Sequence, residues 1–411
     1  MHGRRDGRHR HRGARLTGAR REPQGAAEVL RIALRLGLTS FGGPIAHLGY
    51  FERTYVRERG WLSGEEYAAL VALCQVLPGP TSSQVGFLIG LHRAGWRGAL
   101  AAWLGFTLPS ALLLYACARL AARVQGPLVS ALVHGLKLAA VAVVAEAVWS
   151  MARRLCTDAS TWLIAVGAMV LLLASGSAGA QLAVLLAAAA AGSVWCRPAA
   201  VAVQGIAKEQ WAGTLSLGAF AVLLLGLPVL SWRYPHSGFA LAQVFYRAGA
   251  LVFGGGHVVL PLLRAALVPA GWLSDDAFLG GYGLAQAVPG PLFSVAAYLG
   301  AIAVPGAPPA GATMALIAIF LPGLLLALAG SSVWTTLAHH ARLRAAVTGV
   351  NAAVVGVLAA ALYDPVWLSG VHDGADVAVA GIGLLSLGSG RVPPLAAVVL
   401  CTAASLLRLL V

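Results

Sequence analysis

The stretch FGGPIAHLGYFERTYVRERGWLSGEEYAALVALCQVLPGPTSSQ, residues 41–84, has a second version, FGGGHVVLPLLRAALVPAGWLSDDAFLGGYGLAQAVPGPLFS, at residues 253–294. Both carry FGG, then GWLS, then a glutamine, then PGP. The spacing from GW to PGP is 18 residues in each copy, and the spacing from FGG to PGP is 37 residues in the first copy and 36 in the second. An ordered series of shared motifs indicates an internal duplication.

The duplication extends beyond these motifs. Leu108-Pro109 recurs as Leu321-Pro322, and GLKLAAVAVV at Gly135 resembles GVNAAVVGVL at Gly349. We therefore predict two homologous repeats, 26–195 and 239–411. They would be joined by a linker, 196–238, that contains one extra apolar segment.

The composition places both repeats in a membrane. Hydrophobic residues make up 59% of the chain, charged residues only 11%, and the mean hydropathy is +0.79, whereas about a quarter of the residues of soluble proteins are charged. The long Ala- and Leu-rich runs lack the alternation of a membrane barrel. We predict an all-α, polytopic helical membrane protein. Up to thirteen segments are candidates for spans: 26–50, 65–90, 98–122, 128–150, 160–176, 178–195, 214–232, 239–264, 275–300, 310–336, 343–363, 374–390 and 392–411.

The loop charges favour repeats of opposite orientation, because basic residues collect on the cytoplasmic side. Arg93 and Arg97 follow the first PGP, while the matching loop 302–312 is uncharged. Arg153 and Arg154 follow the fourth segment, whereas the matching loop carries only acidic residues. In the next pair of loops the basic residue, Arg391, lies in the second repeat, as inversion requires, and a fourth pair is balanced. Three of the four pairs therefore favour an inverted repeat. Inverted repeats with broken helices are typical of secondary transporters, which bind substrate where the repeats meet.

The ends and the cysteines suggest no further partner. Residues 1–25 contain eight arginines and almost no apolar side chain, so we expect a disordered cytosolic tail that enforces orientation. An arm for nucleic acid or anionic lipid is the alternative, and we expect no nucleic-acid partner. The five cysteines show no CxxC spacing, so neither a disulfide framework nor a metal site is predicted.

The two PGP motifs are the strongest candidates for a binding site. Proline removes a backbone donor and glycine accepts unusual dihedral angles, so each motif should break a helix in two. The helix that restarts presents unpaired N–H groups and a partial positive charge, which attract anions. The alternative is a simple proline kink. The residues assigned here to substrate binding are Gln75, Pro78, Gly79, Pro80, Thr81, Ser82, Ser83, Gln286, Pro289, Gly290, Pro291 and Ser294.

The FGG motifs and one lysine complete the predicted site. Phe41, Gly42 and Gly43, with Gly254 and Gly255, would interrupt the first helix of each repeat; close helix packing is the alternative. His257 and His47 follow these motifs and could relay protons or simply pack. Lys137 lies in an apolar run and could balance a doubly charged anion, or could reach an interface or pair locally.

Hydrolytic and ATP-driven mechanisms have no visible residues. The sequence contains no HExxH, GxSxG or Walker A motif, and acidic residues in its apolar segments are nearly absent. We expect no enzyme and no cofactor. A membrane enzyme or a structural assembly protein remains the alternative from a different class.

With FGGP, GWLS and LCQVLPGPTSSQ in one repeat and FGGGHVVLPLL, GWLS and AQAVPGP in the other, the chain resembles the chromate ion transporter family in its long, two-domain form. The resemblance covers about 26–150 and 239–362. It implies a carrier in the bacterial inner membrane that exports chromate by means of the proton-motive force and so gives chromate resistance. The family positions carried here are Phe41, Gly42, Gly43, Pro44, Gln75, Pro78, Gly79, Pro80, Thr81, Gly254, Gly255, His257, Gln286, Pro289, Gly290 and Pro291.

The expected partners are chromate or a sulfate-like anion and the lipid bilayer, with a homodimer left open. Sulfate or another oxyanion is the alternative substrate, because both are tetrahedral dianions that the same donors would hold. The Arg-rich leader and the second PGP tail, LFS instead of TSS, depart from the family pattern and place the symmetry of the binding site in question.

Overall fold

The structure is a computed structural model that describes residues 25–121, 123, 126–175, 180–197, 210–235, 237–253, 256–389 and 392–409. Of residues 45, 210 and 333–339 it describes the backbone alone. The predicted disordered tail, apart from Gly25, lies outside the described residues.

Every regular element in these ranges is a helix, which confirms the all-α prediction. The α-helices and the short 3-10 and π helices (η) are α1 (Ala26–Thr39), α2 (Gly43–Phe51), η1 (Glu52–Glu58), α3 (Gly64–Val76), α4 (Thr81–Ala121), α5 (Pro127–Leu155), α6 (Ala159–Ser175), α7 (Ala180–Trp195), α8 (Gln210–Arg233), α9 (Gly238–Leu251), η2 (Gly256–Val258), α10 (Val259–Leu267), α11 (Asp275–Ala287), η3 (Leu292–Ser294), α12 (Val295–Ala303), α13 (Pro308–His339), α14 (Ala341–Ala361), η4 (Leu362–Trp367), α15 (Leu368–Gly370), α16 (Gly374–Gly388) and α17 (Pro394–Leu407).

Five helical stretches are long and apolar enough to cross a bilayer: Thr81–Ala121, Pro127–Leu155, Trp211–Arg233, Pro308–Ser332 and Ala341–Gly370. Six further apolar helices are shorter. The chain is therefore a multi-pass membrane protein. The boundary predicted between the second and third segments is confirmed, because non-helical backbone at Ala94 and Gly95 divides α4 into two helices.

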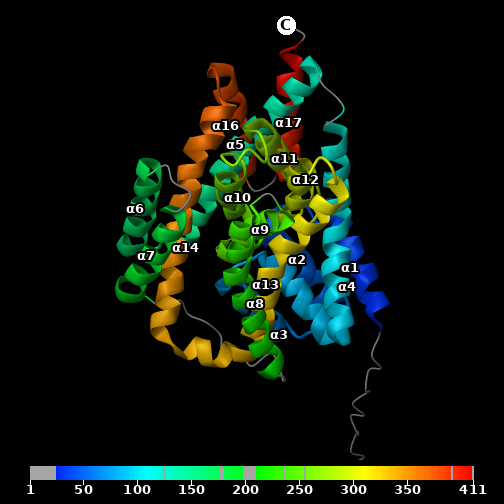
Figure 1. Ribbon diagram of the computed structural model, residues 1–411, viewed down its shortest axis with the longest axis vertical. Helices are drawn as coiled ribbons and strands as arrows, with labels where there is room; N and C mark the ends of the chain where they lie inside the picture. Colours follow the sequence, from blue (N-terminus) through cyan, green and yellow to red (C-terminus); the bar gives the residue numbers. More distant parts are fainter. Residues whose placement is uncertain are drawn as a thin grey trace, which may run out of the picture.

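The helices of the two halves exchange partners. The α6–α7 pair packs against α14 of the second half, and the α16–α17 pair packs against α5 of the first half (Figure 1). Helices α5 and α14 also touch each other. Each half thus completes the packing of the other, and the molecule has one interleaved helical core.

Helices cross closely where small residues meet, and these crossings match between the halves. Gly37 on α1 packs against the backbone of α4, where an added methyl would lie 2.6 Å from the Phe106 carbonyl oxygen. Gly249 on α9 packs against α13 in the same way, and an added methyl there would lie closer still to the Ile319 carbonyl oxygen. Such contacts let apolar helices associate through van der Waals packing in lipid.

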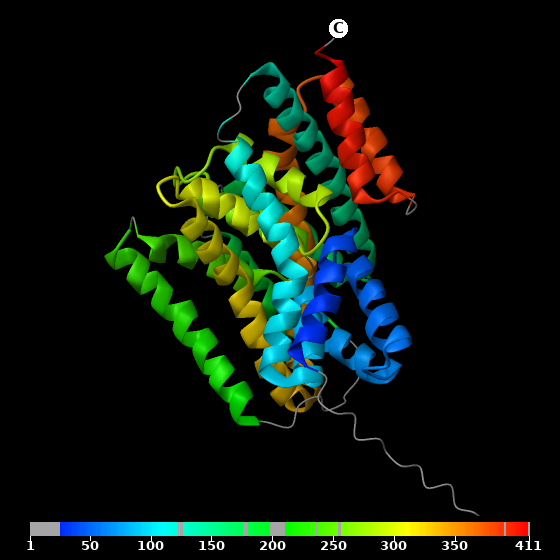
Figure 2. The ribbon, with the colours of Figure 1, turned by 90° about the vertical axis from the view of Figure 1, so that its right-hand side faces the viewer.

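Helix α8 corresponds to the predicted extra segment at 214–232. It lies along the edge of the molecule, green at the left in Figure 2, and packs only against α9 and α13 among the main helix contacts. Only 11% of its most apolar window is buried. The outer face of α8 is therefore available to lipid.

We expect Gly249→Ala to lower the free energy of unfolding by about 1–3 kcal/mol, because the new methyl overlaps the Ile319 carbonyl and forces α9 away from α13. Thermal unfolding in detergent measures the change. Gly218→Ala on α8 is the matched control, since nothing lies within 4 Å of its added methyl. Equal stability of both variants would contradict the close crossing.

Candidate functional site

The repeated motifs correspond to matching local structures. The glycine of each GWLS motif has a positive φ, 58° at Gly60 and 74° at Gly271, a conformation that only glycine adopts readily. The serine of each motif then caps the next helix: Ser63 accepts a hydrogen bond from the Glu66 backbone N–H, and Ser274 accepts one from Ala277. The motif therefore turns the chain and starts α3 or α11.

Both PGP motifs break the helix as predicted. Helix α3 ends at Val76 and α4 starts at Thr81, while α11 ends at Ala287 and η3 starts at Leu292. The central glycines have φ of 122° at Gly79 and 105° at Gly290. The first FGG motif also interrupts a helix, between α1 and α2. In the second FGG, Gly254 and Gly255 lie outside the described residues.

Each PGP motif is bound by the other half of the chain. The Gly79 N–H donates to the Val252 carbonyl at 2.7 Å, and the Gly290 N–H donates to the Ser40 carbonyl at 2.9 Å. Ser40 and Val252 each stand directly before the phenylalanine of an FGG motif. The PGP motif of each half therefore contacts the residue before the FGG motif of the other half. We call the region where these four motifs meet the crossover.

The proline-containing helices close the crossover from both sides. A methyl at Gly79 would lie 2.8 Å from the Gly323 Cα, and a methyl at Gly290 would lie 2.9 Å from Ser110 Oγ. Ser110 and Gly323 directly follow the two Leu-Pro pairs of α4 and α13. The approach is therefore matched in both halves, and any side chain at either PGP glycine would push the halves apart.

Buried hydroxyl groups lie on the elements that follow both PGP motifs. Ser110 and Ser294 lie 2.7 Å apart through their hydroxyl oxygens, and His47 Nδ1 lies 3.3 Å from Ser82 Oγ. These four side chains are all buried. The hydroxyls belong to α4 and η3, the elements that restart or flank the broken helices. Buried hydroxyl groups thus lie on the elements that begin after each PGP motif.

Several buried polar atoms at the crossover have no hydrogen-bond partner: Ser40 Oγ, Ser83 Oγ, Thr107 Oγ1, His47 Nε2 and Gln84 Oε1. Buried polar atoms are normally paired, so an unpaired group calls for an explanation such as a ligand or water. The Gln84 amide instead donates to the carbonyls of Pro78 and Gly323, both at 2.9 Å. Gln84 thereby fixes the first PGP turn against α13.

The remaining predicted residues have different surroundings. Thr81 is half-buried at the start of α4 and Gln75 is exposed. His257 Nδ1 lies 2.7 Å from the Tyr282 hydroxyl, and Gln286 Nε2 is buried without a partner. Ser40, Thr107, Ser110 and Gln84 were not assigned from the sequence, although Ser110 directly follows the Leu-Pro pair that marked the duplication.

Lys137 already has an acidic partner. Its Nζ lies 2.5 Å from Asp276 Oδ1 and donates to the Ser369 carbonyl at 3.4 Å. Asp276 lies in the first turn of α11, whose other end leads into the second PGP. Thirteen helical residues span about 20 Å, so Lys137 lies one helix length from the crossover.

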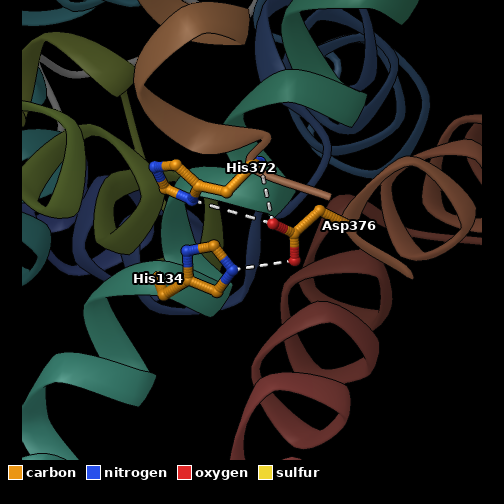
Figure 3. A group of neighbouring side chains, drawn as sticks. All are labelled: His134, His372 and Asp376. Carbon is orange, nitrogen blue, oxygen red and sulfur yellow. Dashed lines mark hydrogen bonds and ion pairs between the residues drawn. The ribbon is translucent and has the colours of Figure 1, made fainter. Parts of the chain in front are cut away.

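A second charged group joins α5 to α16 and α17 (Figure 3). The Asp376 carboxylate, 1% exposed, lies 2.9 Å from His134 Nε2 and 2.7 Å from Arg408 Nη1. It also accepts the backbone N–H of His372 at 2.9 Å. Arg408 reaches Asp373 as well. Hydrogen bonds from the Asp376 backbone N–H and from Arg408 hold the pKa of Asp373 below its ordinary value.

This group fits charge pairing better than a metal ion. The ligand atoms of His134, His372 and Asp376 lie within 4.8 Å of one another, which would admit a transition metal. Arg408, however, already occupies the same carboxylate, and a metal cation there would meet a guanidinium. We therefore interpret the group as an ionic connection between the halves.

Comparison with known proteins identifies relatives over most of the chain. The sequence matches the family described as Chromate transporter over residues 27–193 and 239–406. It is 29% identical to the chromate transport protein of Pseudomonas aeruginosa, covering 83% of this chain and 81% of that protein. It is 28% identical to the chromate transport protein of Cupriavidus metallidurans, covering 82% and 81%. An uncharacterized transporter of Methanocaldococcus jannaschii is 24% identical over 83% and 84%. No solved structure matches significantly.

We expect Asp376→Asn to cost about 3 kcal/mol of unfolding free energy, because it removes a buried charge from its basic partners. Chemical unfolding in detergent measures this. Glu65→Gln, at an exposed position on α3, is the control and should change stability by no more than about 0.5 kcal/mol. Wild-type stability of Asp376→Asn would mean that α16 and α17 dock without the ionic connection.

Proposed function

This chain belongs to the chromate transporter family, and from that premise we propose that it is a secondary carrier which exports chromate across the inner membrane of a bacterium. Members of this family are transport proteins rather than enzymes. The observation that carries the proposal is the crossover, where two broken helices meet beside buried hydroxyl groups without partners. Export would protect the cytoplasm and so give chromate resistance.

The chemistry of the crossover suits a tetrahedral oxyanion. The start of α4 offers backbone N–H groups that have no partner within the helix, and these favour negative charge. Ser83 and Thr107 add buried hydroxyl donors. Transferring an anion from water is costly unless many donors replace the lost hydration, and the first half supplies these donors at the crossover. We therefore place the substrate at the crossover instead of beside Lys137, which is paired with Asp276.

The proposed direction follows from the membrane potential. Moving one negative charge out of a cell that is negative inside is favourable by about 2.3 kcal/mol per 100 mV, and chromate carries two. Voltage alone therefore favours export of a dianion, with any coupled proton adding to this force. Uptake of the same dianion would need coupling that overcomes the potential.

We also propose that the two repeats, 26–195 and 239–411, are inverted relative to each other, with 196–238 as the linker. The loop charges support this, and so do the matched contacts of the two PGP motifs. Alternating access would then consist of rocking one repeat against the other around the crossover.

Everted membrane vesicles test the proposal directly. Vesicles that contain the protein should accumulate radiolabelled chromate when energised, and an uncoupler should abolish the accumulation. Unlabelled sulfate in excess distinguishes the alternative substrate: if sulfate is the better competitor, the carrier is a sulfate transporter. No energy-dependent accumulation of chromate would refute export.

We expect Gly79→Ala to abolish chromate accumulation while membrane insertion is retained. The φ of 122° disfavours alanine, and the methyl would meet the Gly323 Cα. The vesicle assay measures transport, and immunoblotting of the membrane fraction measures insertion. Gly49→Ala is the control, because nothing lies within 4 Å of its added methyl.

We expect Ser83→Ala to raise the half-saturation concentration for chromate by roughly tenfold, the effect of losing one hydrogen bond to a charged ligand. Initial rates over a range of chromate concentrations measure this. Ser150→Ala is the control, since Ser150 bonds to its own helix at the Ala147 carbonyl. An unchanged half-saturation concentration would remove Ser83 from the substrate site.

A further inference from the structure

A small cavity lies between helices of the two halves. Its volume is about 50 Å³, and it is bounded by α7, α9 and α10. The polar side chains that line it are Gln181, Gln243 and Arg247, and its walls include Leu182, Leu251 and Leu262. The lining contains a cation and two amides but no acidic residue.

Arg247 is the unusual member of this lining. It lies in the apolar helix α9, and within the described part of the chain no hydrogen bond or ion pair engages its guanidinium. Arginines at membrane depth are costly, and they almost always pair with an acid or a carbonyl. A half-buried arginine that lines a cavity and has no partner in the protein is therefore able to bind an anion from outside it.

Gln181 supplies a second, independent indication of a ligand. Its side chain is 7% exposed, and its Nε2 is buried without a hydrogen-bond partner. A buried donor without a partner costs about 1–3 kcal/mol. Gln243 precedes Arg247 by one helical turn and therefore lies on the same face of α9. Two amides and a guanidinium thus line one cavity, and this combination of donors suits an oxyanion.

The size of the cavity fits a small anion. A buried water occupies about 10–15 Å³ of a cavity measured in this way. The 50 Å³ cavity therefore has room for roughly three to five waters. A tetrahedral oxyanion, with five heavy atoms, is of similar size. The leucine and alanine walls lower the local dielectric constant, which strengthens attraction between a guanidinium and an anion.

The cavity also adjoins the crossover. Leu251 lines it, and the next residue, Val252, accepts the hydrogen bond from the Gly79 N–H. The matching position in the first half is Arg35, six residues before Phe41 as Arg247 is six before Phe253. Arg35 is exposed. The duplication thus produced an enclosed arginine in only one of its two copies.

We propose that Arg247, Gln181 and Gln243 form a second oxyanion site beside the crossover, which holds a sulfate- or chromate-like dianion. The choice of chromate or sulfate as the ligand rests on the proposed function. The proposal that Arg247 binds an anion is independent of it. The site would hold one anion next to the carrier site and so raise the local substrate concentration on one side of it.

Equilibrium binding of radiolabelled sulfate and chromate to the full-length protein in phosphatidylcholine nanodiscs tests the site. The wild type should bind two anions per chain. Arg247→Gln and Gln181→Leu should each weaken one of the two by at least about tenfold, as expected for loss of a hydrogen bond to a charged ligand. Arg35→Gln is the matched control and should bind as the wild type does.

Two of the following outcomes would overturn the inference, and one would support it while refuting the proposed function. Wild-type binding by Arg247→Gln would do so even if Gly79→Ala abolishes transport, and the proposed function would then stand alone. Conversely, Arg247-dependent binding without any chromate transport would support the site and refute the proposed function. If nanodiscs that contain phosphatidylglycerol abolish the Arg247-dependent binding, the site belongs to a lipid headgroup instead of a free anion.

Arg247→Lys guards against misfolding. It keeps the positive charge but loses the forked guanidinium geometry, so it should fold and bind one anion with intermediate affinity. Thermal unfolding with and without sulfate provides a second readout. Stabilisation by sulfate should be reduced in Arg247→Gln and intact in Arg35→Gln. Equal stabilisation of these two variants would also overturn the inference.

Discussion

The constraint on which the rest of the structure depends is that a helix broken inside a bilayer must find partners for its backbone within the protein. Lipid supplies no hydrogen bonds, and each unsatisfied group costs several kcal/mol. The chain meets this requirement by crossing its breaks. Gly79 donates to Val252, Gly290 donates to Ser40, and the Gln84 amide satisfies the carbonyls of Pro78 and Gly323. A break in one half is therefore stable only in the presence of the other.

The two halves agree in backbone and differ in polar side chains. The first residues of α6 and α16 show this clearly: Asp158 accepts the N–H of Thr161, and Asp373 accepts the N–H of Asp376. Thr161 thus stands where the second half has the buried Asp376. On α14, Thr348 and Asn351 occupy the places of His134 and Lys137 on α5. Among the described residues, the ionic connection exists at one of the two matched helix interfaces. The two halves therefore share an arrangement of helices but carry different charged side chains.

Much of the fold could be predicted from the sequence, because the residues that end and start its helices act on the backbone next to them. Proline and glycine at PGP, and the serine of GWLS, determine where helices stop and start through backbone geometry alone. The membrane class followed from composition. The partners of single side chains could not be predicted in this way. Lys137 meets Asp276, and His134 meets Asp376, over sequence separations of 139 and 242 residues. No local sequence pattern predicts these two contacts, since they depend on helices of one half packing against helices of the other. The same limit explains why Ser110 and Gln84 were not assigned to the site, whereas their neighbours in the motifs were.

The exchange of helix pairs bears on how such a chain arose and how it is made. During synthesis, α6 and α7 leave the ribosome long before α14, against which they pack. The surface of α6 and α7 that packs against α14 is therefore exposed to lipid until the later helices are inserted. An ancestral chain with a single repeat would have had the same surface exposed permanently, and a second copy of itself would have offered the missing partner. Gene fusion would then have made that pairing intramolecular, after which each half was free to diverge.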